Sequence, residues 1–188
     1  MRELAEHLMD LVQNARRARA RHIEMSITAL PESDQLILKV QDDGSGIRPD
    51  LLAKVTDPYA TSRTTRPVGL GLPLLKEQCE QTGGHMKIRS LAQMGTTVEA
   101  VLGLRHIDRL PLGDIGGTMV LLVMDDPDQE YRLVLKSPRG CLDLATADLR
   151  RQLQEVPLHD MAVLDWLAAY VKEQQETIFG GVLDEIIS

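Results

Sequence analysis

The first twenty residues carry two stripes at helical spacing, one apolar and one polar. The apolar stripe consists of Leu4, Leu8, Leu11, Val12, Ala15 and Ala18. Its steps of three and four predict an amphipathic helix from Glu3 to about Ala20. The polar stripe beside it consists of Glu3, His7, Asp10, Asn14 and Arg17. We interpret Glu3 and His7 as a solvated flank, and Asp10 and Asn14 as candidate functional residues.

After this helix the pattern changes to an alternation of apolar and polar residues, which predicts strands. The expected strands cover residues 21–29, 35–40, 85–90 and 96–102. A short helix is expected over residues 49–55. A longer helix opens in the stretch 68–73 and ends at Gly83-Gly84, because proline suits the first helical turn and glycine the position after the last one.

The pattern beyond residue 104 predicts a smaller unit of mixed type. We expect a linker at residues 111–117, an apolar strand at 118–124 and an alternating strand at 131–136. Thr146 is a candidate N-cap for a helix that ends near Glu155. A second helix is expected over residues 159–175.

Charge divides the chain near Arg105. Residues 1–104 carry 13 Lys and Arg against 13 Asp and Glu, whereas residues 105–188 carry 8 against 15 and supply the net charge of −7. We therefore expect one unit at 1–104, a linker at 105–117, and a small α+β module at 118–188. The alternative to a separate module is a hairpin that extends the main sheet, and in either form we expect this part to bind a partner or another subunit. The acidic second half argues against nucleic acid as the partner.

Composition also limits the location of the protein. Two cysteines fit neither a disulfide framework nor a zinc site, which favours a reducing compartment. No apolar run approaches the roughly 18 residues that a membrane-spanning helix needs. We expect a cytoplasmic protein with no membrane partner.

A carboxylate and two glycines follow directly after the strand that ends near Val40. They form the stretch Asp42-Asp43-Gly44-Ser45-Gly46-Ile47. Asp42 is placed to accept a proton from an exocyclic amine, and Gly44 and Gly46 let the backbone lie close against a ring or phosphate. A plain hairpin turn is the alternative interpretation.

Two further stretches carry groups that suit phosphates and a metal ion. Asp10 and Asn14 lie one helical turn apart, and a magnesium ion needs only one or two protein ligands beside phosphates and water. Arg17 shares their stripe and could reach a phosphate. The segment from Asp57 to Pro67 contains Thr61, Ser62 and Arg63, which are donors typical of a loop over phosphates. A solvent-exposed loop is the alternative there.

Four stretches in fixed order resemble the ATP-binding domain of the GHKL superfamily, named for gyrase, heat-shock chaperone ATPases, histidine kinases and the MutL proteins. They are Asp10-Leu11-Val12-Gln13-Asn14-Ala15, Asp42-Asp43-Gly44-Ser45-Gly46-Ile47, Gly69-Leu70-Gly71-Leu72 and Gly95-Thr96-Thr97-Val98. The resemblance covers residues 3–104. It implies a two-layer α/β (α+β) sandwich, in which helices lie on one face of a mixed, mainly antiparallel sheet and ATP binds between helices and lid.

The resemblance also implies roles for single residues. Asn14 matches the magnesium-binding asparagine, and Asp42, with Gly44 and Gly46, matches the aspartate that reads the adenine amino group. Thr96 matches the threonine that helps to hold adenine through water. The phosphate-side residues that match are Gly69, Leu70 and Gly71. Arg17 stands where histidine kinases often have a phosphate-contacting lysine.

Asp10 departs from the pattern, because hydrolytic members usually have glutamate four residues before the asparagine. We take it as the candidate general base. No helical hairpin with a phosphoacceptor histidine precedes Asn14, so a complete sensor histidine kinase is not expected. The expected function is a magnesium- and ATP-dependent regulatory protein, either a kinase acting on a protein partner or a slow ATPase. An ATP-driven clamp and a nucleotide-sensing adaptor without turnover are the alternatives.

Overall fold

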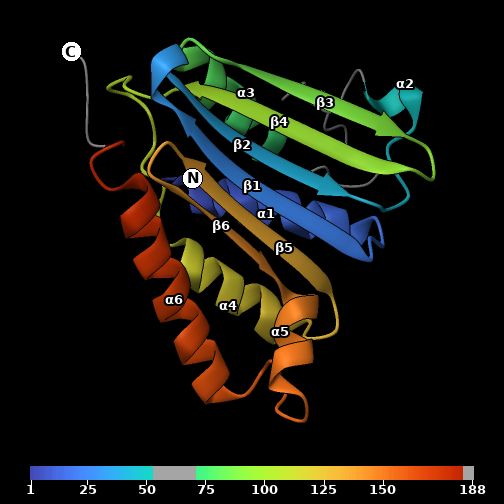
Figure 1. Cartoon of the computed structure of the whole chain (residues 1–188). Coiled ribbons are helices and arrows are strands. Elements are labelled where there is room, and N and C mark those ends of the chain that lie inside the picture. Colours follow the sequence, from blue (N-terminus) through green and yellow to red (C-terminus); the bar gives the residue numbers. More distant parts are fainter. Residues whose placement is uncertain (53–70, 184–188) are drawn as a thin grey trace.

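The structure is a computed structural model that describes residues 1–52 and 71–183. Figure 1 shows its elements, which are α1 Leu4–Arg17, β1 His22–Leu30, the 3-10 turn η1 Pro31–Ser33, β2 Gln35–Asp42, α2 Pro49–Leu52, α3 Gly71–Gln81, β3 His85–Leu91, β4 Gly95–Gly103, α4 Ile115–Asp125, β5 Glu130–Ser137, β6 Gly140–Ala145, α5 Thr146–Leu153 and α6 Met161–Phe179.

Within these described ranges the strands form one six-stranded sheet in the order β3-β4-β2-β1-β5-β6. Every neighbouring pair is antiparallel except β1 and β5, which run parallel. Strand β1 therefore joins the first part of the chain to the hairpin β5–β6. The expected mixed, mainly antiparallel sheet is confirmed.

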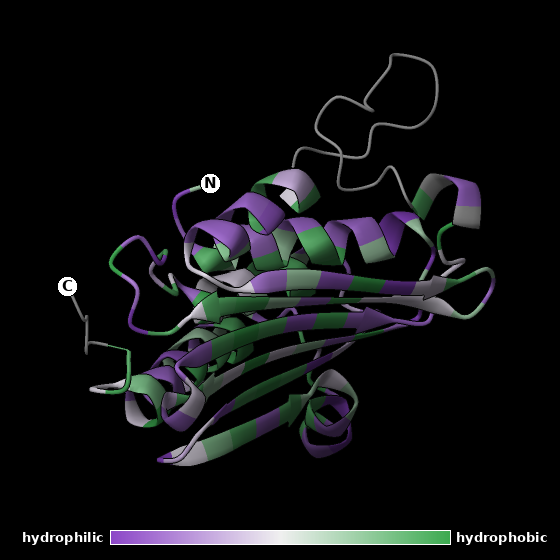
Figure 2. Cartoon of the chain, turned by 90° about the horizontal axis from the view of Figure 1, so that it is seen from above, coloured by the Kyte–Doolittle hydropathy of each residue, from purple (hydrophilic) through white to green (hydrophobic). Residues whose placement is uncertain are grey.

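One face of the sheet carries the helices. Ile23, Met25 and Ile27 of β1 are buried on this face, and their register partners on β5 are also buried, so both strands turn the same side to the helices. Helices α1 and α3 lie against this side in Figure 2, and α6 packs on β5 and β6. The opposite face is partly exposed, as in the expected two-layer sandwich.

The prediction of a strand at residues 118–124 is wrong, because these residues lie in helix α4. A short apolar run fits a buried strand or a buried helix equally well. The helix is started by Asp114, whose Oδ1 accepts a hydrogen bond from the Gly117 amide at 2.8 Å. Gly116, which was assigned to a linker, lets α4 approach α6, since a Cβ there would lie 2.6 Å from the Ala168 carbonyl oxygen.

Two other details of the C-terminal part differ from expectation. Strand β6 was not predicted, and it pairs with β5 to extend the main sheet. Thr146 is the first residue of α5, and its N-cap is Ala145. The Thr146 hydroxyl instead accepts a hydrogen bond from the Tyr131 amide at 2.9 Å. The side chain thus holds the start of α5 against β5.

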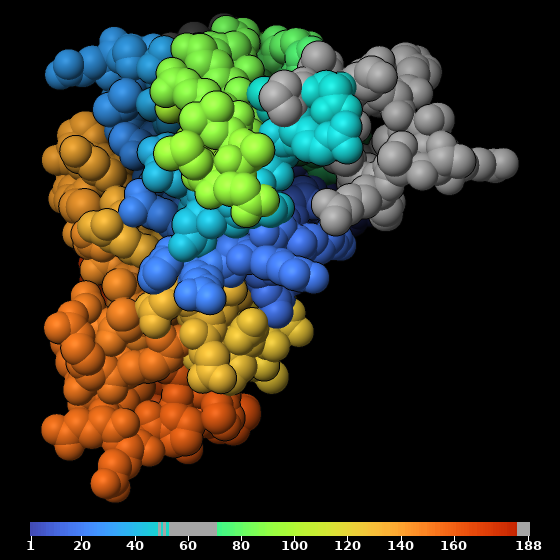
Figure 3. All heavy atoms as spheres, turned by 90° about the vertical axis from the view of Figure 1, so that its right-hand side faces the viewer, coloured from blue at the N-terminus to red at the C-terminus, as the bar shows by residue number. Residues whose placement is uncertain are grey.

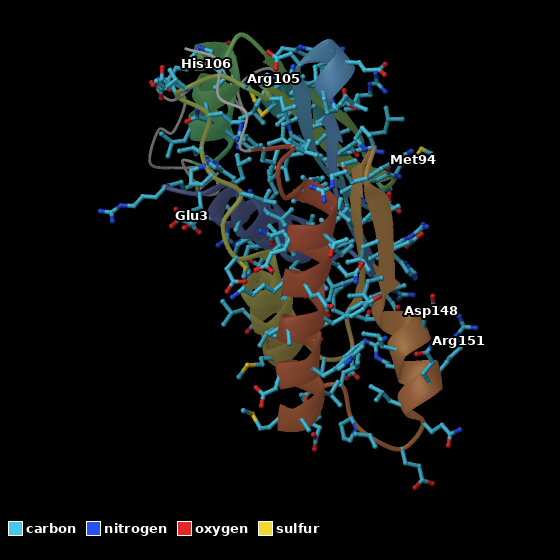
Figure 4. The ribbon with its side chains drawn as sticks, turned by 60° about the vertical axis from the view of Figure 1, so that its left-hand side comes forward. Glu3, Met94, Arg105, His106, Asp148 and Arg151 are labelled. Carbon is cyan, nitrogen blue, oxygen red and sulfur yellow. The ribbon has the colours of Figure 1, made fainter. Side chains whose placement is uncertain are left out.

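The segment between the two parts is also bonded to the sheet and to α1. Arg105, labelled in Figure 4, donates from its amide to Asp34 Oδ1 at 3.1 Å. The amides of Leu4 and Ala5 donate to the carbonyls of Pro111 and Leu112 at 2.9 and 3.0 Å. Buried residues from both parts form a single hydrophobic core.

None of the helices in the described ranges is both long and apolar enough to cross a membrane.

Thr146 allows a test of how tightly the β5–β6–α5 part is bound into the fold. The side chain is fully buried, so Thr146→Val leaves the Tyr131 amide without a partner, and the free energy of unfolding should fall by about 1–3 kcal/mol. Urea unfolding followed by circular dichroism measures this change. The matched control is Thr177→Val, because Thr177 is exposed on α6 and should change stability by about 0.5 kcal/mol or less. Equal losses for both variants would contradict this role of Thr146.

Candidate functional site

Helix α1 carries a chain of hydrogen bonds along its polar stripe. The Asn14 amide donates from Nδ2 to Asp10 Oδ2 at 3.3 Å. Its Oδ1 accepts from Arg17 Nη1 at 3.2 Å. Asp10 and Asn14 are both partly exposed, so a carboxylate and an amide face solvent one helical turn apart, as the sequence predicts.

Asp10 also lies against the first residue of α3. A Cβ added to Gly71 would lie 1.9 Å from Asp10 Oδ2 and 2.5 Å from Asp10 Cγ. The carboxylate therefore occupies the space that any side chain at position 71 would need. The absence of that side chain brings the N-terminus of α3, with its free amide groups, next to the candidate base.

His7 is not part of a solvated flank, and that prediction is wrong. Its side chain is 2% exposed, and it interacts with the backbone of Gly71. Burial lowers the pKa of His7 below its ordinary value. The apolar stripe gave no sign of this, because His7 lies at its margin and is covered by α3.

Asp42 ends strand β2 as a half-buried carboxylate. Its Oδ1 accepts a hydrogen bond from the Gly44 amide at 2.8 Å. Burial raises the pKa of Asp42, although hydrogen bonds from the backbones of Gly44 and Thr96 act in the opposite direction. Gly46 has a φ of +68° and lies so close to the β3–β4 turn that a Cβ would be 2.1 Å from the Leu91 carbonyl oxygen. The loop thus needs glycine at position 46 for two reasons.

Thr96 lies directly beside Asp42, because the two residues are register partners on β4 and β2. Its hydroxyl is 2.9 Å from the Ser90 hydroxyl. Ser90 Oγ in turn donates to the Gly95 carbonyl at 3.0 Å and accepts from the Ile47 amide at 2.7 Å. Sequence reasoning missed Ser90, although its position opposite Thr96 across a tight hairpin was a usable signal.

Asp43, unlike its neighbour Asp42, uses its carboxylate in hydrogen bonds that stabilise the fold. Its carboxylate accepts from the amides of Arg21 and His22 at 2.6 and 2.9 Å and lies 2.8 Å from His22 Nδ1. Partial desolvation raises the pKa of this group, but the bonds with His22 and Arg21 outweigh it and lower the pKa to about 2. Asp43 therefore holds the α1–β1 turn.

Backbone hydrogen bonds gather these pieces at one edge of the sheet. The Ser45 amide donates to the Ala18 carbonyl at 2.8 Å, and the Gln93 amide donates to the Ser45 carbonyl at 2.9 Å. The glycine loop is therefore held between the end of α1 and the β3–β4 turn. Figure 3 shows this edge, with the residues near 45 between the blue and the green segments.

A hollow of about 490 Å³ lies between the C-terminal ends of α1 and α4. Its lining residues are Gln13, Arg16, Arg17, Arg19, Ala20, Asp125, Asp126 and Gln129. Arg16 forms an ion pair with Asp125 and lies 3.7 Å from Asp126. The C-terminal ends of α1 and α4 meet here, and helix dipoles favour cations at such ends. Arg16 thus links the C-terminal ends of α1 and α4 through these ion pairs.

Five candidate residues, Thr61, Ser62, Arg63, Gly69 and Leu70, lie outside the described residues. The other candidates lie on elements that contact one another: Asp10, Asn14 and Arg17 on α1, Asp42 at the end of β2, Gly44 and Gly46 on the loop that follows it, Gly71 on α3 and Thr96 on β4. Over the described ranges no group of three or more His, Cys, Asp or Glu could hold a metal ion.

Residues 2–106 match the family described as histidine kinase-, DNA gyrase B- and HSP90-like ATPases. The sensor kinase CckA of Brucella abortus is 30% identical over 114 residues, which are 53% of this chain and 12% of the relative. The sensor histidine kinase ZraS of Salmonella typhimurium is 36% identical over 93 residues, 49% of this chain and 20% of the relative. The chain therefore spans about a fifth or less of these relatives' length.

The fold agrees with a solved structure described as the N-terminal domain of a DNA repair protein. The TM-score is 0.51 at 14% identity, over 77% of this chain and 53% of the other. This likeness concerns the fold alone. Because the family match extends over more than half of the sequence, the chain belongs to the family of histidine kinase-, DNA gyrase B- and HSP90-like ATPases.

Proposed function

We propose that the chain binds ATP or ADP with magnesium at this edge and acts as a histidine-kinase-like kinase or ATPase on a protein partner. The observation that carries the proposal is that the loop after Asp42, which is paired with Thr96, is held against Ala18 at the end of α1, the helix that carries the Asp10–Asn14 pair. A plain turn explains the Asp42 loop but gives no reason for the Asp10–Gly71 contact.

In this proposal Asp42 recognises the adenine base through its exocyclic amine. One carboxylate oxygen accepts from Gly44, and a carboxylate has further lone pairs for an exocyclic amine. Thr96 holds adenine through water, with its hydroxyl oriented by Ser90. Gly44 and Gly46 let the loop pack closely against Ala18 and Leu91, which holds it beside the proposed adenine site.

The phosphate side is formed by α1 and the start of α3. Asn14 is the residue that would hold magnesium, which fits the small donor set because magnesium keeps water and phosphate ligands. When bound, the ion neutralises charge on the phosphates. Arg17 is the candidate phosphate contact. The free amides at the start of α3, beginning at Gly71, suit an anion.

Asp10 takes the proton from the attacking group. Its carboxylate lies against Gly71 and accepts from Asn14, so its position is fixed from two sides. The acceptor is water in an ATPase and a partner's side chain in a kinase. We further propose that residues 118–188 serve a protein partner or a second copy in the cytoplasm.

A nucleotide-sensing adaptor is the second candidate. It is favoured by the short side chain of Asp10, which is already engaged by Asn14 at 3.3 Å. Incubation with labelled ATP and cell extract separates the candidates, because a kinase labels protein, an ATPase releases phosphate, and an adaptor does neither.

Asp42→Asn should remove nucleotide binding, because the amide oxygen is engaged by the Gly44 amide and the NH2 group then meets the adenine amine as a second donor. A ligand at about 100 times its Kd stabilises a fold by about 2.7 kcal/mol, so thermal unfolding with and without Mg-ATP measures the effect. The matched control is Asp165→Asn on the exposed side of α6, which should respond like the parent. Parental binding by the Asp42 variant would make Asp42 a turn residue only.

As the pH falls, nucleotide binding should weaken at a higher pH than it would with an aspartate of ordinary pKa. Burial raises the pKa of Asp42, so the carboxylate gains its proton, and stops accepting from the amine, at a higher pH. Titration with adenosine, which has no phosphate to protonate, measures this loss. A raised folded-state pKa makes the contribution of Asp42 to folding stability larger as pH falls, so its protonation weakens binding without destabilising the fold. Affinity that stays constant down to the ordinary range of aspartate would contradict this assignment.

Asp10→Asn should bind Mg-ATP about as well as the parent and lose turnover or transfer by roughly 10²–10⁴-fold, the contribution of a general base. The amide keeps the size of the side chain but has no basicity. Calorimetry measures the Kd for Mg-ATP. Phosphate release or partner labelling measures the rate of turnover or transfer. Turnover at the parental rate would exclude Asp10 as the base.

A further inference from the structure

His7 is a buried polar residue that the proposed chemistry does not use. It lies on α1 one turn before Asp10 and is 2% exposed. Its Nδ1 is buried and, among the described residues, has no hydrogen-bond partner. An unsatisfied buried nitrogen costs free energy, so an apolar residue of similar size would pack here with less loss. The imidazole therefore needs a reason to be at this position.

The ring lies at the start of α3. It interacts with the backbone of Gly71, and burial keeps the ring in its neutral form. A neutral ring suits this place, because the N-terminal end of α3 carries a partial positive charge. Figure 4 shows the beginning of α1, labelled at Glu3, next to α3, and the two helices are in contact.

His7 and Asp10 hold Gly71 from two successive turns of α1. Asp10 fills the space beside the Gly71 Cα, at 1.9 Å from the position that a Cβ would take. His7 lines a cavity together with Leu74 of the first turn of α3, and burial lowers its pKa against the smaller, opposite effect of a hydrogen bond with the Gly71 backbone. The first turn of α3 thus lies against both the candidate base and the imidazole.

A small cavity of about 150 Å³ adjoins the ring, and Asp10 is not among its lining residues. Its lining residues are Met1, His7, Leu74, Glu77, Gln78, Gln81 and Leu110. A water molecule takes up about 30 Å³ of liquid, so the cavity has room for water that could reach the ring. The polar lining from α3 makes water a suitable occupant.

We propose that His7 is a positioning residue of the nucleotide site, which sets the first turn of α3 relative to Asp10. The distance between the free amides of α3 and the carboxylate then depends on the imidazole. This inference rests on the proposed function. A residue that only fills space would be replaced by leucine without effect on α3 or on the nucleotide.

The test compares His7→Leu and His7→Gln with His159→Leu, an exposed histidine before α6 as control. Hydrogen exchange of the nucleotide-free protein reports on α3 directly, because the Leu75 amide bonds to the Gly71 carbonyl in a regular helix. In His7→Leu this amide should exchange about tenfold faster, and Mg-ATP affinity should fall about tenfold, since small misplacements in a site have large effects.

His7→Gln, which keeps a polar side chain, should recover most of both losses, and His159→Leu should show neither. Unchanged exchange at Leu75 in His7→Leu would overturn the inference, whatever the nucleotide result. If the parent binds no nucleotide while Leu75 exchange still depends on His7, the proposed function fails and the positioning of α3 by His7 stands. Unfolding in urea shows that each variant is folded, and His7→Leu should be at least as stable as the parent.

Discussion

The packing of α1 on the sheet is the constraint on which the site depends. The helix buries its apolar stripe completely or nearly so, and this burial fixes its rotation about its own axis. The polar stripe then lies outside the contact with the sheet, and the helix ends next to Ala18, beside the point where β2 ends and β4 begins. Asp10 and Asn14 are therefore held in place by hydrophobic packing, which costs them none of their hydrogen-bonding capacity.

Most of the fold followed from patterns that local sequence can carry, and the same patterns selected the candidate site residues. The alternation in β1 and β2 and the glycine-rich turn after Asp42 are local signals, and the ordered motifs identified the domain. The helix α4 and strand β6 were missed because they depend on distant partners. Gly116 is packed against Ala168, and β6 is recognised as a strand only beside β5. An apolar run or a glycine alone cannot report such contacts.

His7 and Ser90 show the same limit within the site. His7 belongs to the polar stripe by sequence, but α3 covers it, so its environment is set by residues more than sixty positions away. Ser90 lies on a strand in which alternate residues are exposed, and only the register with Thr96 shows what it orients. Helical or strand periodicity describes one element, whereas a site is made of contacts between elements.

The two neighbouring aspartates of the glycine loop show how such contacts divide chemical roles. Burial raises the pKa of Asp42, while hydrogen bonds from the α1–β1 turn bring the pKa of Asp43 to about 2. Asp43 is ionised over a wide range of pH and keeps the turn closed through His22 and Arg21. That fixed turn holds the loop, so Asp42 can remain half-buried with acceptor capacity to spare. In the proposed site, Asp42 keeps acceptor capacity for a ligand because Asp43, next to it in sequence, makes the bonds that close the turn.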